Sequence, residues 1–324
     1  MLSSAVIVCN DNIPNNSFIC YRYRDFTMKI LITGASGQIG SYVLKELVDK
    51  YDAVGVDLKP YPIKDLKDLV IRGDLRDYEF VREIVKDVDA VIHLAAQVSV
   101  ENSWNDPIYD AENNIIATIN LLKACSDYGV DRFIYTSSAA VYGNPQYVPI
   151  DEEHPKNPIS PYGVSKLAGE YYCRVFSDRI HTVIIRPFNV FSARMDPNNP
   201  YSGVIAKFIS RVKQKLPPVI YGDGKQTRDF VHVRDVVDFV EIALKRGENG
   251  EAYNVGTGRE TSILELARII MDIAGINGKP VFDKPRKGDI RRSCADISKA
   301  RKLGFEPKTD LRRDLEEIFE EFNE

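Results

Sequence analysis

A tyrosine and a lysine stand four residues apart, at Tyr162 and Lys166, in a stretch with helical periodicity. Side chains at this spacing share one face of an α-helix, so the two groups would be neighbours. An ammonium beside a phenol lowers the tyrosine pKa from its ordinary value of about 10. Ser138, at the end of the strand predicted just before, offers a hydroxyl that could orient a substrate oxygen. The pattern favours a proton-transfer site, although a lone pair of this kind is also common on ordinary helix surfaces.

A glycine-rich turn follows the first predicted strand, with Gly34, Gly37 and Gly40 at intervals of three residues. Such glycines permit a tight turn, let backbone N–H groups approach a pyrophosphate, and let the following helix pack closely on the strand. The usual dinucleotide fingerprint places its first two glycines two residues apart. A glycine turn can also be a plain strand-to-helix connection.

A carboxylate supports the dinucleotide interpretation. Asp57 ends the second predicted strand, 23 residues after Gly34, where it can accept hydrogen bonds from the adenosine ribose. It would repel a 2′-phosphate, so NAD is favoured over NADP, although Lys59 could partly offset the repulsion. After the third predicted strand, Asp74 and Leu75 could contact the adenine edge.

Short β-branched runs alternate with longer amphipathic stretches from residue 29 onward, which predicts parallel strands joined by crossover helices. The strands, apolar on both faces, are predicted at 29–33, 53–57, 69–73, 90–95, 132–138 and 181–187. The helices between them are predicted at 38–50, 78–86, 108–128 and 161–176. We therefore expect an α/β fold with a doubly wound parallel sheet of the Rossmann type.

The sequence pattern changes after residue 187, where Pro-, Gly- and Asn-rich loops separate helices predicted at 203–213, 234–246, 262–273 and 309–322. We expect residues 28–187 to form a dinucleotide-binding domain to which later segments return. Residues 188–324 would be mainly a smaller α/β lobe for the substrate. Residues 1–27 are expected to be a flexible extension or the product of an upstream start, because Met28 directly precedes the first strand. A ligand is expected between the carboxyl edge of the sheet and the smaller lobe.

Composition argues against several classes of function. The 43 Lys and Arg residues against 47 Asp and Glu give a formal charge of −4, which offers no footprint for nucleic acid or an anionic membrane. No apolar run reaches the ~18 residues of a membrane span. The five cysteines are widely spaced, and no cluster with metal-ligand spacing occurs, so we expect no disulfide framework, no metal and a reducing cytosol. His93 and His232 lie in apolar strands and are interpreted as core residues.

Six segments occur in a recognisable order: TGASGQIG (33–40), GDLRD (73–77), HLAAQ (93–97), YTSSAAVYG (135–143), SPYGVSK (160–166) and RPFNV (186–190). In this order they resemble the extended short-chain dehydrogenases/reductases, and within that family the UDP-sugar 4-epimerases, over about residues 28 to 322. The resemblance implies NAD as cofactor, a UDP-sugar as substrate, and a homodimer formed through helices of the large domain.

Residue by residue, the resemblance implies two sets of contacts. The residues implied to contact NAD are Gly34, Gly37, Gln38, Ile39, Asp57, Asp74, Leu75, Leu94, Ala95, Ala96, Gln97, Asn114, Tyr162, Lys166 and Phe188. Those implied to contact the UDP-sugar are Ser138, Asn189, Val204, Tyr221, Arg228 and Arg286. The arginines suit this role independently, since a diphosphate bound to an acidic protein needs charge-assisted donors. Arg228 beside Asp229 could instead form a surface ion pair.

A few residues indicate which reaction of this family the chain catalyses. Relatives that dehydrate or decarboxylate nucleotide sugars add acidic residues after the strand-end Ser or Thr, where this chain has Ala139 and Ala140. Two methyl groups cannot act as acid or base. The implied reaction is therefore 4-epimerisation of UDP-glucose and UDP-galactose through a transient 4-keto sugar, as in galactose metabolism. In it Tyr162 is the base, Lys166 lowers its pKa and binds the nicotinamide ribose, and Ser138 aligns the proton.

Alternatives differ in substrate or in class. Uronate 4-epimerases typically carry threonine at the position of Asn189 and a basic residue at that of Asp196, so a uronate is disfavoured. Ser293 takes the position that borders the sugar's 2-substituent in the resembling enzymes, where a small residue leaves room for an N-acetyl group. Dehydratase or decarboxylase activity stays open, and so does a non-catalytic NAD-binding sensor, although such sensors typically lack the Tyr/Lys pair.

Overall fold

The computed structural model describes residues 28–195, 203–285 and 288–321. Its centre is a seven-stranded parallel sheet in the order β3, β2, β1, β4, β5, β6, β11. The strands are β1 (Lys29–Thr33), β2 (Asp52–Asp57), β3 (Val70–Arg72), β4 (Ala90–His93), β5 (Arg132–Thr136), β6 (His181–Pro187) and β11 (Ala252–Val255). The chain winds outward from β1 in both directions, so the predicted Rossmann-like α/β fold is confirmed.

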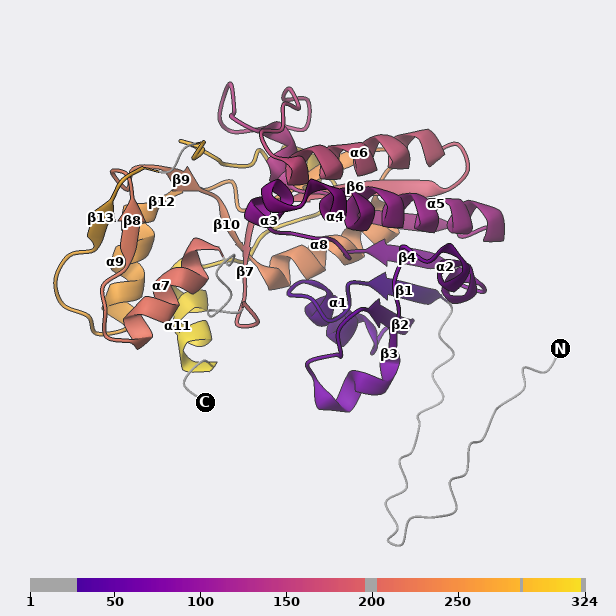
Figure 1. Cartoon of the computed structure of the whole chain (residues 1–324), viewed down its shortest axis with the longest axis horizontal. Coiled ribbons are helices and arrows are strands. Elements are labelled where there is room, and N and C mark those ends of the chain that lie inside the picture. Colours follow the sequence, from indigo (N-terminus) through magenta and orange to yellow (C-terminus); the bar gives the residue numbers. More distant parts are fainter. Residues whose placement is uncertain (1–27, 196–202, 286–287, 322–324) are drawn as a thin grey trace, which may run out of the picture.

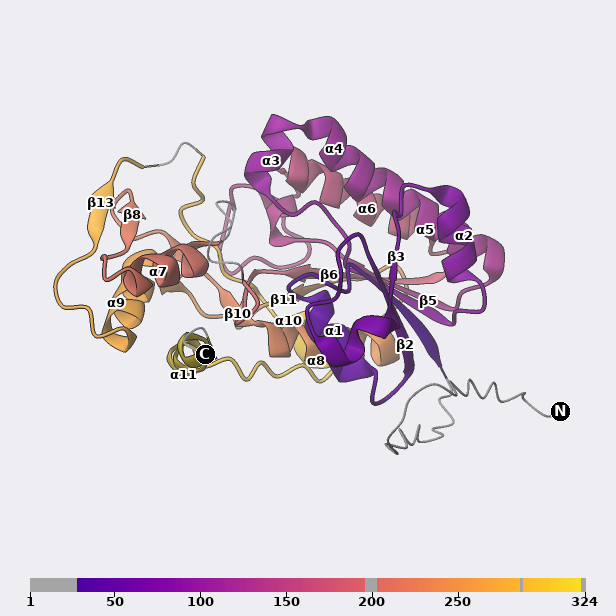
Figure 2. The same ribbon diagram turned by 60° about the horizontal axis from the view of Figure 1, so that its bottom comes forward.

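Helices cover both faces of this sheet (Figures 1 and 2). On one face lie α1 (Gly40–Leu47) and α8 (Val233–Arg246), and on the other α2 (Tyr78–Val85), α5 (Ala117–Tyr128) and α6 (Pro161–Phe176). Side chains of β1 alternate between the two layers, since Ile30 and Ile32 join the first and Leu31 the second. Covering both faces explains why the strands are apolar throughout.

Two elements of the larger part, one strand of the sheet and one helix packed on it, come from late in the chain. β11 pairs with β6, with Tyr253 opposite Ile185, and α8 packs on the sheet through Val236 and Val240. The helix expected at 234–246 is therefore present, but it lies on the sheet and not among the helices of the smaller lobe. β11 is only four residues long and was not among the predicted strands.

The helix expected at 108–128 is present as a continuous helical segment, but it contains a π-helical turn that was not predicted. The segment consists of α4 (Pro107–Ala111), the π-helical turn at Glu112–Ile116 and then α5, and a short helix, α3 (Val100–Asn105), precedes it. Pro107 begins α4, and the Asp106 side chain caps it by accepting from the N–H of Tyr109. The buried side chain of Asn114 lies inside the π-turn. Turns of this type often mark functional positions, and apolar periodicity does not reveal them.

The smaller lobe has its own apolar core. It contains α7 (Val204–Lys213), α9 (Ile263–Ile273) and α11 (Leu311–Glu321), packed through side chains such as Phe208, Leu266 and Leu315. Three short strand pairs complete it: β7 (Asn189–Phe191) with β10 (Phe230–His232), β8 (Val219–Tyr221) with β13 (Val281–Asp283), and β9 (Thr227–Arg228) with β12 (Thr261–Ser262). Two 3₁₀ turns, Lys64–Leu69 and Ala139–Tyr142, and α10 (Ser298–Lys302) belong to the larger part. The carboxyl ends of the large sheet's strands face this lobe (Figure 1).

No helix in the described ranges is long and apolar enough to cross a membrane.

Candidate active site

The glycine turn after β1 is sterically required. Gly34 has a φ of +68°, and a Cβ on it would lie 2.6 Å from the backbone nitrogen of Ala95. A Cβ on Gly40 would lie 2.1 Å from the carbonyl oxygen of Gly34. Bare backbone at the start of α1 thus faces the carboxyl edge of the sheet, which fits the pyrophosphate of a dinucleotide.

Asp57 ends β2 beside this turn. One carboxylate oxygen accepts from the N–H of Ser36 at 2.9 Å, and the other from the N–H of Lys59 at 2.8 Å. These bonds fix the carboxylate at the edge of the sheet, where a ribose of a bound dinucleotide is expected. Asp74, by contrast, is engaged by Arg76 at 2.6 Å, and that hydrogen bond lowers the pKa of the aspartate. Leu75 is buried next to it.

The segment after β4 is held by the π-turn. The N–H of Gln97 donates to Oδ1 of Asn114 at 2.7 Å, and Nδ2 of Asn114 donates to the Gln97 carbonyl at 3.0 Å. The preceding residues Leu94 and Ala95 both donate from their backbone N–H to Oγ1 of Thr33 at 3.2 Å. The predicted cofactor residues after β1 and after β4 are therefore brought together at one edge.

Tyr162 and Lys166 share the buried face of α6. The Ser160 hydroxyl caps this helix by accepting from the N–H of Gly163 at 3.1 Å, and Pro161 begins it. Tyr162 is 9% and Lys166 3% exposed. Tyr162 and Lys166 therefore lie on one face of the helix, as predicted, at the end of the helix that approaches Ser138.

The electrostatics of the pair differ from the expectation. Burial raises the pKa of Tyr162, and a hydrogen bond with Ser138 opposes that shift. Burial also lowers the pKa of Lys166 to about 8, against the opposing charge of Asp110. The ammonium lies 4.9 Å from the ring centre of Tyr135. In these surroundings the desolvation of the phenolate outweighs any help from Lys166, so the pKa of Tyr162 is shifted upward and not downward.

A buried ion pair ties the catalytic helix to the sheet, and sequence reasoning missed it. The carboxylate of Glu170 accepts from Nε of Arg186 at 2.8 Å and from Nη2 at 2.7 Å, while the Ser137 hydroxyl donates to it at 2.6 Å. Both charged side chains are fully buried. The network fixes α6 against β5 and β6 directly beside Ser138. Arg186 in an otherwise apolar strand was the available signal.

The residues assigned to the sugar nucleotide lie on the smaller lobe and its connection. Phe188 is buried against Tyr142 with ring centres 6.5 Å apart, and Asn189, next in the chain, is exposed at the start of β7. Val204 begins α7. Tyr221 ends β8 and lines a pocket of about 540 Å³ together with Gly222, Asp223, Gln226, Asp283, Pro285, Asp289 and Arg291.

Arg228 is paired with Asp289 and not with its neighbour Asp229. Its Nη2 donates to Asp289 at 2.6 Å, and its Nη1 donates to the carbonyl of Ile290 at 2.6 Å. Asp229 is fully buried and accepts from the N–H and the hydroxyl of Thr257. The alternative of a surface pair between Arg228 and Asp229 is therefore wrong. Ser293 is buried in the loop that precedes the isolated bridge between Ala295 and Ile150. Arg286 and Asp196 lie outside the described residues.

His93 is a core residue, as expected. Thr33 lies 2.7 Å from its Nδ1 and Thr118 3.0 Å from its Nε2, and burial lowers the pKa of His93 to about 3. His232 is buried and accepts from the N–H of Arg234 at the start of α8. Within the described part of the chain, no group of three or more His, Cys, Asp or Glu side chains is placed to hold a metal ion.

The doubly wound sheet, the glycine turn and the Tyr162–Lys166 helix together define an extended short-chain dehydrogenase/reductase. The chain belongs to the NAD dependent epimerase/dehydratase family, whose model matches residues 30–256. A protein of Methanocaldococcus jannaschii, provisionally assigned as a UDP-glucose 4-epimerase, is 41% identical over 297 residues, which cover 89% of this chain and 96% of that protein.

Solved structures agree with the fold throughout. UDP-glucose 4-epimerase from Thermotoga maritima, solved with UDP-glucose, is similar with a TM-score of 0.86 and 36% identity, covering 91% of this chain and 99% of the other. UDP-glucose 4-epimerase from Thermus thermophilus, solved with NAD, gives a TM-score of 0.83 and 33% identity with the same coverage.

Relatives with another reaction are similar as well. A dTDP-D-glucose 4,6-dehydratase of Mus musculus is 32% identical over 320 residues, covering 91% of this chain and 88% of that protein. Family membership therefore leaves several reactions open.

Proposed function

We propose that this protein is an NAD-dependent UDP-sugar 4-epimerase that interconverts UDP-glucose and UDP-galactose. The observation that carries the proposal is the buried Tyr162, which is hydrogen-bonded with Ser138. Ser138 is followed in the chain by two alanines, Ala139 and Ala140, and not by acidic residues. A dehydratase needs an additional acid at that edge, whereas an epimerase does not. The similarity to UDP-glucose 4-epimerases over nearly the whole chain supports the same choice.

NAD is the cofactor that the family uses, and the residues present fit it. Its pyrophosphate would lie over the bare backbone of Gly34 and Gly37, with Gln38 and Ile39 at the start of the helix. Asp57 would accept from the adenosine ribose and disfavour a 2′-phosphate. When bound, NAD⁺ would supply a hydride acceptor and a positive charge. That charge would counter the burial that raises the pKa of Tyr162.

The protein's own groups then move a proton and hold the substrate. Tyr162 takes the proton of the sugar's 4-hydroxyl and returns it to the 4-keto oxygen after the sugar has turned over in the pocket. Ser138 orients that oxygen, and Lys166 binds the nicotinamide ribose. Arg228 would anchor the diphosphate after exchanging its contact with Asp289. A firmly held UDP with a loosely held sugar permits the rotation that epimerisation requires.

The proposed substrates are neutral hexoses, with the N-acetylated pair accepted as well. Asn189 stands where uronate enzymes carry threonine, so no device for a sugar carboxylate is evident at that position. Ser293 is a small side chain next to Arg292, which is held by Glu260 at 2.5 Å. We expect it to leave the sugar's 2-position uncrowded.

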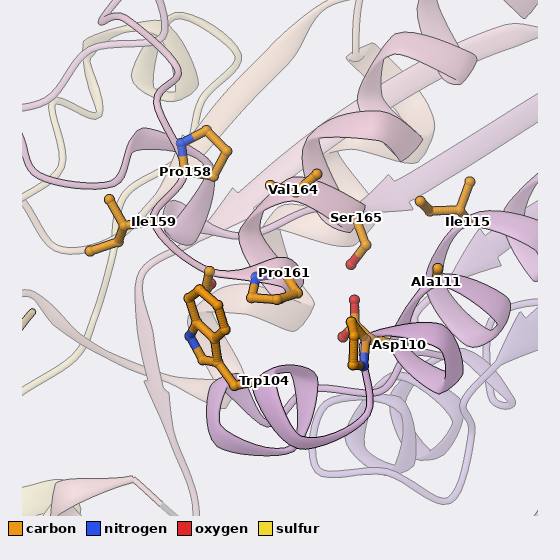
Figure 3. A pocket seen from close by; sticks show the side chains of 11 residues that line it. Trp104, Asp110, Ala111, Ile115, Pro158, Ile159, Pro161, Val164 and Ser165 are labelled. Atoms are coloured by element: carbon orange, nitrogen blue, oxygen red, sulfur yellow. The ribbon is translucent and has the colours of Figure 1, made fainter.

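A homodimer through the helical face around α6 is also part of the proposal. Large apolar side chains are exposed there on three helical segments: Trp104, Ile108, Ile116, Val164, Tyr171 and Val175. Two of them, Trp104 and Val164, line an open pocket of about 450 Å³ (Figure 3). A patch of this kind on a monomer is typical of an association surface. Light scattering at several protein concentrations would test it.

A reducing cytosol is the proposed compartment, because the described cysteines Cys125, Cys173 and Cys294 are buried free thiols.

The decisive experiment incubates the purified protein with a panel of UDP- and dTDP-sugars and follows the carbon-4 proton signals by NMR. Appearance of the 4-epimer of UDP-glucose, and its absence with Tyr162→Phe, is the expected result. Formation of a 4-keto-6-deoxy sugar would instead assign the dehydratase reaction. Binding of NAD without turnover of any sugar would leave the sensor alternative.

A further inference from the structure

A buried carboxylate lies behind the catalytic helix, outside the proposed substrate and cofactor contacts. Asp110 on α4 is 1% exposed. Its Oδ1 accepts from the side-chain amide of Gln97 at 2.7 Å and from that of Asn114 at 3.1 Å. Both donors are neutral, so in the described part of the chain this charge has no ion-pair partner. Burying a carboxylate without a cation is costly, and the cost calls for a function.

Hydrogen bonds connect Asp110 to the catalytic helix. Nδ2 of Asn114 also donates to Oγ of Ser165 at 3.0 Å, and the Ser165 hydroxyl donates to the Tyr162 carbonyl at 3.0 Å. α4 packs directly against α6, and the side chains of Asp110 and Ser165 point toward one another in Figure 3. Asp110 is thus connected to the backbone that carries both catalytic side chains.

The surroundings of Lys166 leave Asp110 as its uncompensated counter-charge. The charged and titratable groups around this ammonium are Asp110 on α4, Tyr162, Glu170 and Cys173 on α6, Tyr135 on β5 and His93 on β4. Glu170 is neutralised by Arg186 at 2.7 Å. Asp110 has only amide donors, and it is the strongest influence that raises the pKa of Lys166 against burial. The same charge raises the pKa of Tyr162.

We propose that Asp110 is a positioning residue for the catalytic pair: its Oδ1 holds the amides of Gln97 and Asn114, and through Asn114 and Ser165 it holds the backbone of α6, while its negative charge acts on the buried ammonium of Lys166. The inference rests on the proposed roles of Tyr162 and Lys166. Removing the charge lets both groups release their protons at lower pH, because a negative neighbour favours the protonated form of each. A purely structural role would change stability and leave both titration midpoints in place.

Asp110→Asn isolates the charge, because only Oδ1 makes hydrogen bonds in the structure and an asparagine oxygen can keep them. The Lys166 midpoint is read from ¹³Cε-lysine NMR, with the signal assigned by its loss in Lys166→Met. The Tyr162 midpoint is read from phenolate absorbance as the difference from the matching Tyr162→Phe protein. We expect both midpoints to fall by ~0.5–1 pH unit, with the rate–pH profile moving in the same direction.

Glu112→Gln is the matched control, since Glu112 lies two residues further on, is about half exposed and pairs with Arg76. It should leave both midpoints unchanged. If Asp110→Asn does not fold, Asp110→Glu and Asp110→Gln, equal in size, should differ in the Lys166 midpoint, with the Gln variant lower. Coinciding midpoints in either pair of proteins would overturn the inference. Failure to epimerise any sugar would refute the proposed function, while the two titrations would still decide the role of Asp110.

Discussion

The guanidinium of Arg228 contacts the carboxylate of Asp289, 61 residues further along the chain, at 2.6 Å. Its sequence neighbour Asp229 is occupied elsewhere, where it accepts from Thr257 and from the N–H groups of Gly258 and Ala295. Arg228 therefore has a partner that a diphosphate can replace, since the pair is partly exposed at the pocket that Asp289 lines. Asp229 in turn connects the segment at Thr257 and Gly258 with the segment at Ala295.

Arg228→Leu should weaken the binding of UDP by about 10–100-fold, as expected for the loss of ~1.5–3 kcal/mol from a charged hydrogen bond. Isothermal titration calorimetry with UDP measures this directly. Arg82→Leu, at an exposed arginine of α2 paired with Glu79, is the control and should bind UDP normally. An unchanged affinity in Arg228→Leu would remove Arg228 from the diphosphate site.

Tyr162→Phe should retain NAD and UDP binding but lose at least ~10²-fold in turnover, the lower end of what a general base contributes. Ser138→Ala should lose less, because it orients an oxygen and does not accept the proton. Single-turnover kinetics with UDP-galactose compares the two variants with the wild-type protein. Near-normal turnover in Tyr162→Phe would identify another base.

Asp57→Asn should raise the affinity for NADP relative to NAD, because the repulsion of the 2′-phosphate is removed. The amide oxygen can accept only one of the two backbone bonds from Ser36 and Lys59, because each binds a different carboxylate oxygen of Asp57, so circular dichroism must first show that the variant is folded. Titration of the cofactor-free protein with both dinucleotides measures the ratio. Equal affinity of the wild-type protein for NAD and NADP would contradict the role of Asp57.

Ser293→Tyr should suppress turnover of the N-acetylated UDP-sugars selectively, by at least the ~1–3 kcal/mol of a steric mismatch in a pocket. UDP-glucose and UDP-galactose should be largely spared. The ratio of kcat/KM for the two pairs is the measurement. If both pairs lose activity equally, or if the wild-type protein rejects N-acetyl sugars, Ser293 is not the selecting residue.

Glu170→Leu should destabilise the protein by ~3–5 kcal/mol, because it leaves Arg186 charged and unpaired in the core. Asp127→Leu, which breaks the exposed pair with Lys123, is the control and should change little. Denaturant unfolding monitored by circular dichroism gives both values. A small effect at Glu170 would mean that water reaches Arg186.

The sequence predicted the fold because the relevant patterns are local. Apolar runs, the glycine spacing and the Tyr162–Lys166 interval each extend over a few residues, and they led correctly to a doubly wound parallel sheet with helices on both faces. The π-turn around Asn114 was not predictable, since it depends on contacts with Gln97 and Ser165 from other segments. Local propensity carries no information about such partners.

The electrostatics were the least predictable part. The Tyr162–Lys166 spacing suggested a lowered tyrosine pKa, but burial acts in the opposite direction and depends on every element packed around α6. The partner of Arg228 was equally out of reach, because ion pairing between segments 61 residues apart follows from the fold. The ion pair of Arg186 and Glu170 was not predicted either, although an arginine in an otherwise apolar strand signals a buried partner.

The chain passes back and forth between the large sheet and the smaller lobe. It leaves the sheet after β6, returns with α8 and β11, leaves with α9, returns with α10 and leaves again with α11. No single cut can therefore release one lobe from the other. A protease that nicks the exposed loop at residues 277–279 should yield two fragments that still elute together in gel filtration. The two lobes should also melt in one transition, so thermal scans cannot assign a separate stability to the half that holds the sugar.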